Sequence, residues 1–140
     1  MRMCIDYRKV NSIKKKDSYP LPRIDEIIDD MGGASIFSKL VLAQGYHQIR
    51  IRPEYVPKTA FQTQFRSFQF RVMPFGLCNA PATFQRTMNV LLADCRAFAR
   101  VYLDYILIYS HSLEEHAKHV RIVLEKLWAD KPLAKLKKCL

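Results

Sequence analysis

The sequence has little glycine and no long apolar run, and both shortages narrow the class of protein. Only four of its 140 residues are glycine and seven are proline, too few for a collagen-like or low-complexity chain. No apolar stretch approaches the roughly 20 residues that a membrane helix needs. The first residues also contain none long enough for a secretory signal. We therefore expect an intracellular protein, in the cytoplasm or the nucleus, that is not secreted and has no membrane partner.

Cysteine is scarce as well and is scattered along the chain. The four cysteines are Cys4, Cys78, Cys95 and Cys139, with no Cys-x-x-Cys pair. This spacing is typical of separate intracellular thiols rather than of a disulfide framework or a zinc site.

Positive charge, in contrast, is abundant. Lysine and arginine number 23 against 13 aspartates and glutamates, which leaves a net charge of +10. With 49% hydrophobic and 26% charged residues the balance is otherwise that of a globular domain. A small domain this basic suggests a polyanionic partner, most often nucleic acid. Solubility through net charge is the alternative interpretation.

Local patterns in the first half of the chain mix strands and helices. Residues 2–8 alternate loosely and predict an edge strand. Helical spacing of apolar residues begins at Pro20-Leu21-Pro22 and ends at Gly32-Gly33. A short apolar run over 36–42 predicts a buried strand, and alternation over 59–72 predicts a hairpin.

The second half continues this mixture. Asn79 is placed to cap a helix that has proline in its first turn. Residues 97–108 are rich in β-formers but interrupted at Asp104, and Ser112 to Glu115 fits the capping box of a last helix. Strands and helices follow each other without regular βαβ alternation. The predicted fold class is therefore α+β, an antiparallel sheet packed on helices.

Asp104 is the first candidate for chemistry because it interrupts a run of β-formers. Carboxylates are rarely buried without a partner or a metal. From this segment alone, a solvated aspartate at a hairpin tip is the simpler interpretation. His116 and His119 have a spacing that could bind a metal on a helix, but no third ligand is evident, and exposed histidines are favoured.

A set of segments in a fixed order changes the interpretation of Asp104. Together, and over almost the whole chain, they resemble the reverse transcriptase of gypsy-type (metavirus) long-terminal-repeat retrotransposons. The segments are Arg2-Met3-Cys4-Ile5-Asp6-Tyr7-Arg8, Tyr19-Pro20-Leu21-Pro22-Arg23-Ile24, Phe37-Ser38-Lys39-Leu40, Gly45-Tyr46-His47-Gln48-Ile49, Lys58-Thr59-Ala60-Phe61, Val72-Met73-Pro74-Phe75-Gly76-Leu77-Cys78-Asn79-Ala80-Pro81-Ala82-Thr83-Phe84-Gln85 and Tyr102-Leu103-Asp104.

This resemblance implies a fragment of a right-hand polymerase. Residues 1–35 and 47–75 would form partial fingers, and residues 36–46 and 76–140 would form the palm. The thumb, the connection and the RNase H domain are expected to be absent, and the start of the fingers would precede Met1.

The resemblance also implies a site at which three aspartates hold two Mg²⁺ ions, and here the sequence departs from the family. Val41 follows Phe37-Ser38-Lys39-Leu40, and Tyr105 follows Asp104, where the family has aspartates. Two ions about 3.5–4 Å apart repel each other unless carboxylates neutralise them. With Asp104 as the only catalytic and metal-binding carboxylate, we expect the two-ion site not to form. The resemblance thus implies the RNA-directed DNA polymerase class, but the chain as it stands is predicted to be inactive.

Four other positions match nucleotide-binding residues of the family. Arg2 matches an arginine that contacts the incoming triphosphate, and Tyr46 matches an aromatic gate against the ribose 2′-hydroxyl. Phe75 and Gly76 resemble residues that border the nucleotide pocket. The alternatives are a terminal side chain for Arg2, a packed turn aromatic for Tyr46 and an ordinary turn at Phe75-Gly76.

The partners implied are an RNA or DNA template–primer and deoxynucleoside triphosphates, while the oligomeric state is not indicated. Lys58, Arg66 and Arg71 are the predicted contacts to the nucleic-acid backbone, and further basic candidates are Lys14, Lys15, Lys16, Arg23, Arg50 and Arg52. For each of them taken alone a solvated surface charge is the favoured interpretation, whereas the group as a whole favours nucleic-acid binding. Two other functions remain open: a non-catalytic nucleic-acid-binding module and a non-functional relic of an element.

Overall fold

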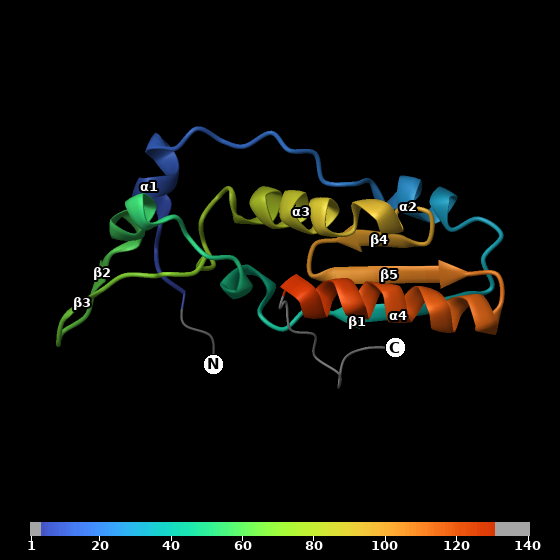
Figure 1. Cartoon of the computed structure of the whole chain (residues 1–140). Helices are drawn as coiled ribbons and strands as arrows, with labels where there is room; N and C mark the ends of the chain where they lie inside the picture. The colour runs from blue at the N-terminus through green and yellow to red at the C-terminus, as the bar shows by residue number, and fades with distance from the viewer. Residues whose placement is uncertain (1–3, 131–140) are drawn as a thin grey trace.

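The structure, a computed structural model, describes residues 4–130 and is built around a three-stranded antiparallel sheet (Figure 1). The strands are β1 (Ile36–Val41), β4 (Ala99–Tyr102) and β5 (Tyr105–Ser110), in the spatial order β1-β5-β4. Two long helices, α3 (Ala80–Leu91) and α4 (Leu113–Asp130), pack against it. The predicted α+β class is confirmed.

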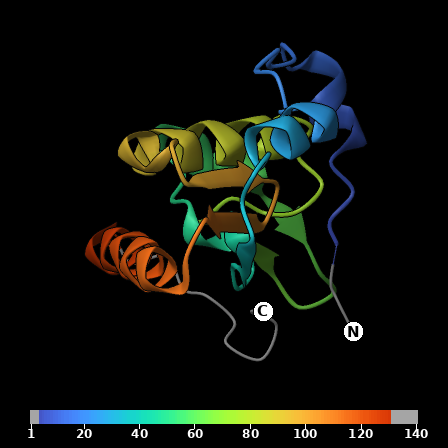
Figure 2. The same cartoon turned by 90° about the vertical axis from the view of Figure 1, so that its right-hand side faces the viewer.

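The two helices cover the same face of the sheet (Figure 2). Side chains of one parity on each strand point to one face, and on all three strands this parity belongs to a single apolar core with residues of α3 and α4. The core includes Leu40, Val101, Ile106, Ile108, Phe84, Met88, Val123 and Leu127. The opposite parity, which includes Val41 and Tyr105, faces away from these helices. The sheet therefore has one face buried by helices and one face free of them.

A second unit projects from the sheet at the end where β4 turns into β5 (Figure 1). It contains α1 (Arg8–Ile13), the 3₁₀ helix η2 (Pro53–Thr59) and a hairpin of β2 (Phe61–Gln62) and β3 (Ser67–Phe68). The 3₁₀ helix η1 (Gly45–Gln48) leads from β1 toward this unit. The remaining elements are α2 (Ile24–Asp30) and the 3₁₀ helix η3 (Ala93–Cys95). None of the helices within residues 4–130 is sufficiently long and apolar to cross a membrane.

The predicted edge strand over 2–8 is wrong where the structure describes it, because residues 4–7 form no strand and α1 begins at Arg8. The phenol of Tyr7 instead reaches into the fold and donates to the Thr59 carbonyl oxygen at 3.0 Å. The predicted hairpin exists but is shorter than 59–72, since only Phe61↔Phe68 and Gln62↔Ser67 pair. The alternation of residue types therefore predicted the hairpin correctly but overestimated its length.

Helix starts were predicted with mixed success. The first predicted helix begins only at Ile24, because proline keeps the residue before it extended. Asn79 stands at the start of α3 without capping it. Its amide nitrogen donates to the Lys15 carbonyl oxygen at 3.0 Å, so it ties the chain before α2 to α3. Ser112 does cap α4, since its Oγ accepts a hydrogen bond from the Glu115 amide at 3.3 Å.

Candidate functional site

The candidate site lies at the turn between β4 and β5. Leu103 and Asp104 form this two-residue turn, and Leu103 has a φ of 53°. The left-handed region costs a residue with a side chain roughly 1–2 kcal/mol. The Leu103 amide donates to Gln85 Oε1 at 3.1 Å, and the Leu42 amide donates to the Asp104 carbonyl oxygen at 3.0 Å. Two neighbouring elements therefore hold the backbone on either side of Asp104.

Val41 and Tyr105 lie next to this turn on the face of the sheet that the helices leave free. They are directly opposite each other in the pairing of β1 with β5. Val41 is 7% exposed and Tyr105 is 37% exposed. The Lys39 ammonium lies 5.7 Å from the centroid of the Tyr105 ring. The structure thus brings together the three positions that the sequence resemblance assigns to metal ligands.

The residues at these three positions do not fit a pair of metal ions. Only Asp104 offers a carboxylate, and Val41 has no lone pair to donate. Nowhere within residues 4–130 do three or more histidine, cysteine, aspartate or glutamate side chains gather as a metal site would require. Mg²⁺ is a hard cation that selects oxygen ligands, and two ions about 3.5–4 Å apart are normally clamped by several such groups.

Tyr46, on η1, lies close to Asp104 within a cluster of aromatic rings. Its ring centroid is 5.1 Å from that of Phe75 and 5.5 Å from that of Phe84. Burial, and to a lesser extent the negative charge of Asp104, raises the pKa of the Tyr46 phenol. The preceding Gly45 is required by close packing, because a Cβ atom there would lie 2.9 Å from the Phe84 ring.

The turn at Phe75-Gly76 is anchored to α1. Gly76 has a φ of 95°, and a Cβ atom on it would lie 3.1 Å from the Ile5 carbonyl oxygen. Asn11 Nδ2 donates to the Gly76 carbonyl oxygen at 2.8 Å, while Asn11 Oδ1 accepts from the Cys78 amide at 2.9 Å. The two predicted nucleotide-pocket residues therefore sit on a turn that glycine and α1 fix together.

The predicted backbone contacts Lys58, Arg66 and Arg71 are all exposed, on or beside the hairpin. The Lys58 ammonium lies 4.7 Å from the Tyr55 ring centroid. The Arg66 guanidinium lies 5.3 Å from the ring centroid of Phe68. Cations held over aromatic rings keep their outer side available to phosphate. Arg2, the predicted contact to the incoming triphosphate, lies outside the described residues.

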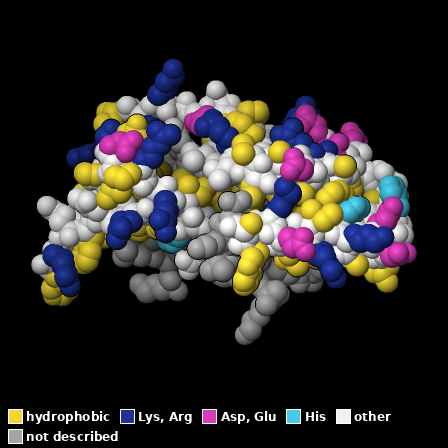
Figure 3. All heavy atoms as spheres, in the orientation of Figure 1, with side chains coloured by type: hydrophobic (Ala, Val, Ile, Leu, Met, Phe, Trp, Pro, Cys, Tyr) yellow, Lys and Arg dark blue, Asp and Glu magenta, His cyan; other side chains and the backbone are white. Residues whose placement is uncertain are grey.

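Basic side chains also gather around a cavity of about 630 Å³ between α1 and η2. Its lining includes the apolar residues Ile51 and Met73, and none of the described residues in the lining is acidic. Figure 3 shows dark blue side chains over this end of the molecule. The cations that line the cavity are Lys14, Lys15, Arg50, Arg52 and Lys58.

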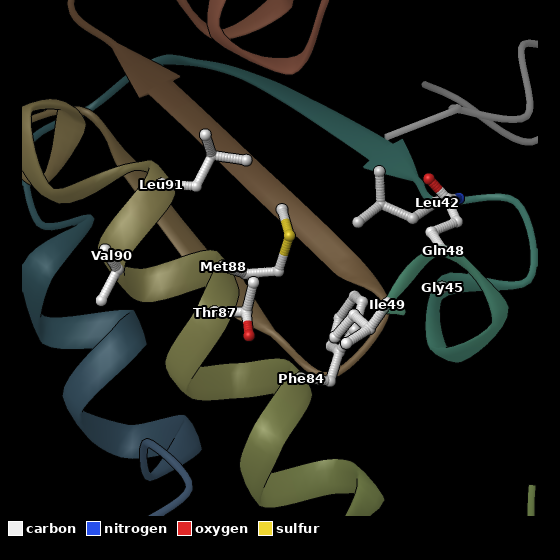
Figure 4. Close-up of a pocket in the computed structure, with 9 residues that line it drawn as sticks. All are labelled: Leu42, Gly45, Gln48, Ile49, Phe84, Thr87, Met88, Val90 and Leu91. Atoms are coloured by element: carbon white, nitrogen blue, oxygen red, sulfur yellow. The ribbon is translucent and has the colours of Figure 1, made fainter. Parts of the chain in front are cut away.

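A smaller cavity of about 300 Å³ lies between α3 and η1 (Figure 4). Its lining is mostly apolar, and none of the described residues that line it carries a charge. It shares Gly45 and Phe84 with the packing around Tyr46. We assign it to that packing rather than to a separate site.

The two histidines of α4 are not the exposed pair that the spacing suggested. His116 is 7% exposed, with Nδ1 2.9 Å from Ser110 Oγ and Nε2 2.9 Å from Ser38 Oγ. His119 Nδ1 lies 2.8 Å from the same Ser110 hydroxyl, and its ring stacks on Phe98 at 3.9 Å. These hydrogen bonds join α4 to the sheet, because the serine hydroxyls on the strands pair with the histidine ring nitrogens on the helix.

Gln85 is the residue of the site that sequence reasoning missed. It is completely buried on α3 and bonds to the backbone of the turn that carries Asp104. The available signal was a polar residue next to Phe84 on the core face of the helix, with Asn89 four residues on. Such a pair lies on one side of a helix, but the sequence does not reveal which backbone it meets.

Comparison with solved structures gives the class of protein. The foamy viral protease–reverse transcriptase, solved in complex with double-stranded DNA, superposes with a TM-score of 0.91 at 25% sequence identity. The match covers 99% of this chain and 24% of that chain. The sheet with its two helices and the projecting unit are therefore the palm and fingers of a right-hand polymerase.

Comparison with sequences gives the family. The profile described as "Reverse transcriptase (RNA-dependent DNA polymerase)" matches residues 1–140, and the chain belongs to this family. An RNA-directed DNA polymerase homolog of Oenothera berteroana is 50% identical over 129 residues, which are 89% of this chain and 91% of that protein. A retrovirus-related Pol polyprotein from transposon 297 of Drosophila melanogaster is 45% identical over 139 residues, 99% of this chain but 13% of the polyprotein.

Proposed function

We propose that this chain is the reverse transcriptase domain of a gypsy-type retrotransposon and that it binds a template–primer without extending it. The observation that carries the proposal is the pairing of Val41 directly opposite Tyr105, beside Asp104. A polymerase of this family needs its carboxylates at that point, and one remains. The ordered segments of the sequence and the transposon relative support the gypsy-type assignment.

Electrostatics explains why one carboxylate is insufficient. Two divalent ions about 3.5–4 Å apart repel by of order 10–20 kcal/mol at an effective dielectric constant near 20. A single carboxylate offsets only part of this repulsion. The substrate phosphates cannot replace the missing carboxylates, because they take part in the reaction. For scale, losing one group that stabilises the transition state commonly costs roughly 10²–10³ in rate. Two missing ligands should cost at least as much.

The proposal also divides the chain into two parts with different roles. Residues 1–35 and 47–75 act as partial fingers, and residues 36–46 and 76–140 act as palm. Lys58, Arg66 and Arg71 would contact the backbone of an RNA or DNA template–primer, while Tyr46, Phe75 and Gly76 would border a deoxynucleoside triphosphate. Mg²⁺ is the cofactor that the family implies. The protein would act inside the cell, in the cytoplasm or the nucleus.

Primer extension tests the proposal most simply in a chimera. The chain replaces the corresponding segment of the transposon 297 polyprotein, which supplies the flanking domains, and the unmodified polyprotein is the positive control. We expect no Mg²⁺-dependent extension with the chain as it stands and clear extension with the Val41→Asp, Tyr105→Asp double variant. Each single substitution is expected to restore little. Robust extension by the unsubstituted chimera would refute the proposal.

A non-catalytic nucleic-acid-binding module is the second candidate function. It is favoured by the five cations around the 630 Å³ cavity, which need no metal to hold phosphate. Binding to a primer–template that weakens steeply with salt would separate this function from that of a relic. Absence of a cooperative melting transition would instead favour a relic.

A further inference from the structure

We propose that Gln85 is the positioning residue of the turn that carries Asp104, and that the backbone of the metal site is intact although two of its ligands have been replaced. The second half of this inference rests on the proposed function, because it takes Val41 and Tyr105 to occupy ligand positions. The first half rests on the hydrogen bonds around Gln85 alone.

The amide of Gln85 makes three hydrogen bonds in a site closed to water. It has no exposed surface. Nε2 donates to the Val101 carbonyl oxygen at 2.8 Å and to Asn89 Oδ1 at 3.1 Å, and Oε1 accepts from the Leu103 amide at 3.1 Å. Turning the amide over would set its NH₂ group against the Leu103 N–H and its oxygen against the Val101 carbonyl. The orientation of the side chain is therefore fixed by its backbone partners.

These bonds act at the point where the turn is strained. Within residues 4–130, Leu103 is one of two non-glycine residues with positive φ. Gln85 binds the carbonyl of β4 at Val101 and the amide of Leu103, so it bridges the start of the turn. On the other side, the Leu42 amide holds the Asp104 carbonyl oxygen at 3.0 Å. We call these three hydrogen bonds the clamp. None of them involves the side chain of Val41 or Tyr105.

The clamp is backed by a second layer of contacts on α3. Asn89, which accepts from Gln85, donates through Nδ2 to the Tyr19 hydroxyl oxygen at 2.9 Å. The Arg86 guanidinium lies 4.9 Å from the Tyr19 ring centroid and 2.8 Å from the Asp17 carboxylate. The segment before α2 is thus bound to the same helix that supports the turn. Gln85 is well placed to orient Asp104 without touching a substrate.

Because the clamp is intact, the metal site lacks only the two ligand side chains at positions 41 and 105. The β1–β5 register places position 41 opposite position 105 regardless of the side chains there. Carboxylates restored at both positions would therefore stand beside Asp104 on the free face of the sheet. Two substitutions should suffice to restore metal binding, with no repair of the backbone.

The first experiment needs no metal and uses the chain as it exists. Gln85→Met keeps the volume of the side chain but removes its donors and its acceptor. We expect the Leu103 amide to exchange with solvent at least about tenfold faster by NMR, because its partner is gone. Asn89→Ala is the matched control, since it removes the outer partner and keeps the Gln85–Leu103 bond. Unchanged exchange of Leu103 in folded Gln85→Met would overturn the role of Gln85.

A double-mutant cycle with Leu103→Gly shows whether the role concerns the strained turn. Glycine adopts positive φ without penalty, so Leu103→Gly should be better tolerated in Gln85→Met than in the unsubstituted chain. Additive shifts of the unfolding midpoint would contradict the inference. Should Gln85→Met not fold, Gln85→Asn replaces it in the same comparison. The asparagine side chain is shorter, so its amide cannot reach the three partners together.

The second experiment measures Mn²⁺ binding by electron paramagnetic resonance on the Val41→Asp, Tyr105→Asp chain. We expect binding to be gained over the unsubstituted chain and then weakened about 10–100-fold by adding Gln85→Met, as for other groups that orient metal ligands. No gain in the double variant would count against the proposed function and against an intact site, whatever Leu103 exchange shows. A gain that Gln85→Met leaves untouched would overturn only the role of Gln85.

Discussion

Asp104 retains its carboxylate, and its charge affects the neighbouring residue Tyr46. Burial is the larger cause that raises the pKa of the Tyr46 phenol, and the charge of Asp104 adds to it because a carboxylate disfavours the phenolate. Asp104→Asn is therefore expected to lower the pKa of Tyr46, since the charge disappears and the burial remains. Titration of tyrosine Cζ resonances by NMR measures this directly.

Tyr109 is the matched control for this titration. Burial also raises its pKa, but the charges that act on it are Arg100, which lowers it, and Asp30, which raises it. Its pKa should not move in Asp104→Asn. A Tyr46 pKa that is unchanged, or a Tyr109 pKa that falls by as much, would mean that Asp104 does not act locally on Tyr46.

At the scale of single residues, sequence reasoning was strongest where a side chain broke a pattern. Asp104 interrupts a run of β-formers, and the structure places it at the predicted hairpin tip. The neighbourhood of Val41 and Tyr105 followed from the resemblance and is reproduced by strand pairing. Gln85 was missed because its role depends on a backbone 18 residues away, and no local pattern encodes such a contact.

Among the contacts that fasten α4 to the sheet, one hydroxyl is shared by two histidines. Ser110 Oγ lies within hydrogen-bond distance of both His116 Nδ1 and His119 Nδ1, and Ser110 is 2% exposed. Ser110→Ala would remove this hydroxyl from two ring nitrogens, one at a buried and one at a half-buried position. We expect it to lower the free energy of unfolding by about 1–3 kcal/mol, measured by urea denaturation.

Ser35→Ala is the control for this destabilisation. Ser35 Oγ donates to the His111 carbonyl oxygen at 3.0 Å, but this bond is solvent-exposed and water replaces it. Its effect should stay within about 0.5 kcal/mol. If the two serine variants were equally stable, the buried network would not fasten α4.

Sequence patterns predicted the presence of helices and strands better than the residues at which they end or the burial of their side chains. The strands around Asp104 and the Ser112 cap of α4 were predicted correctly. Residues 2–8 alternate, yet the chain enters α1 there, because burying Tyr7 against Thr59 outweighs the weak local preference. The histidine spacing gave the right helix but the wrong exposure, since burial depends on the sheet against which α4 packs.

At the scale of the whole molecule, the net charge of +10 is distributed unevenly. Cations line the 630 Å³ cavity, and Lys58, Arg66 and Arg71 lie on or beside the hairpin. Figure 3 shows dark blue side chains gathered at this end of the molecule. Alanine at any of these three is expected to weaken binding to a duplex primer–template. It should also reduce the salt slope by about 0.9 for each phosphate that is no longer neutralised, measured by fluorescence anisotropy across a salt series.

Lys118→Ala provides a control of equal charge change. Lys118 lies on α4, away from the hairpin (Figure 1), and pairs with Glu114 at 3.6 Å. Its removal should leave both the affinity and the salt slope unchanged. An equal effect of all four substitutions would show that net charge, and not this end of the molecule, attracts the nucleic acid.

The metal content of the site, assembled with its substrates, decides whether two Mg²⁺ ions can bind beside Asp104. A crystal of the chain with a primer–template and an incoming nucleotide, soaked in Mn²⁺, would reveal each ion by its anomalous scattering. With Asp104 as the single carboxylate, at most one ion is expected beside it, held together with the nucleotide phosphates. Two ions about 3.5–4 Å apart at Asp104, with Val41 and Tyr105 in place, would contradict the account.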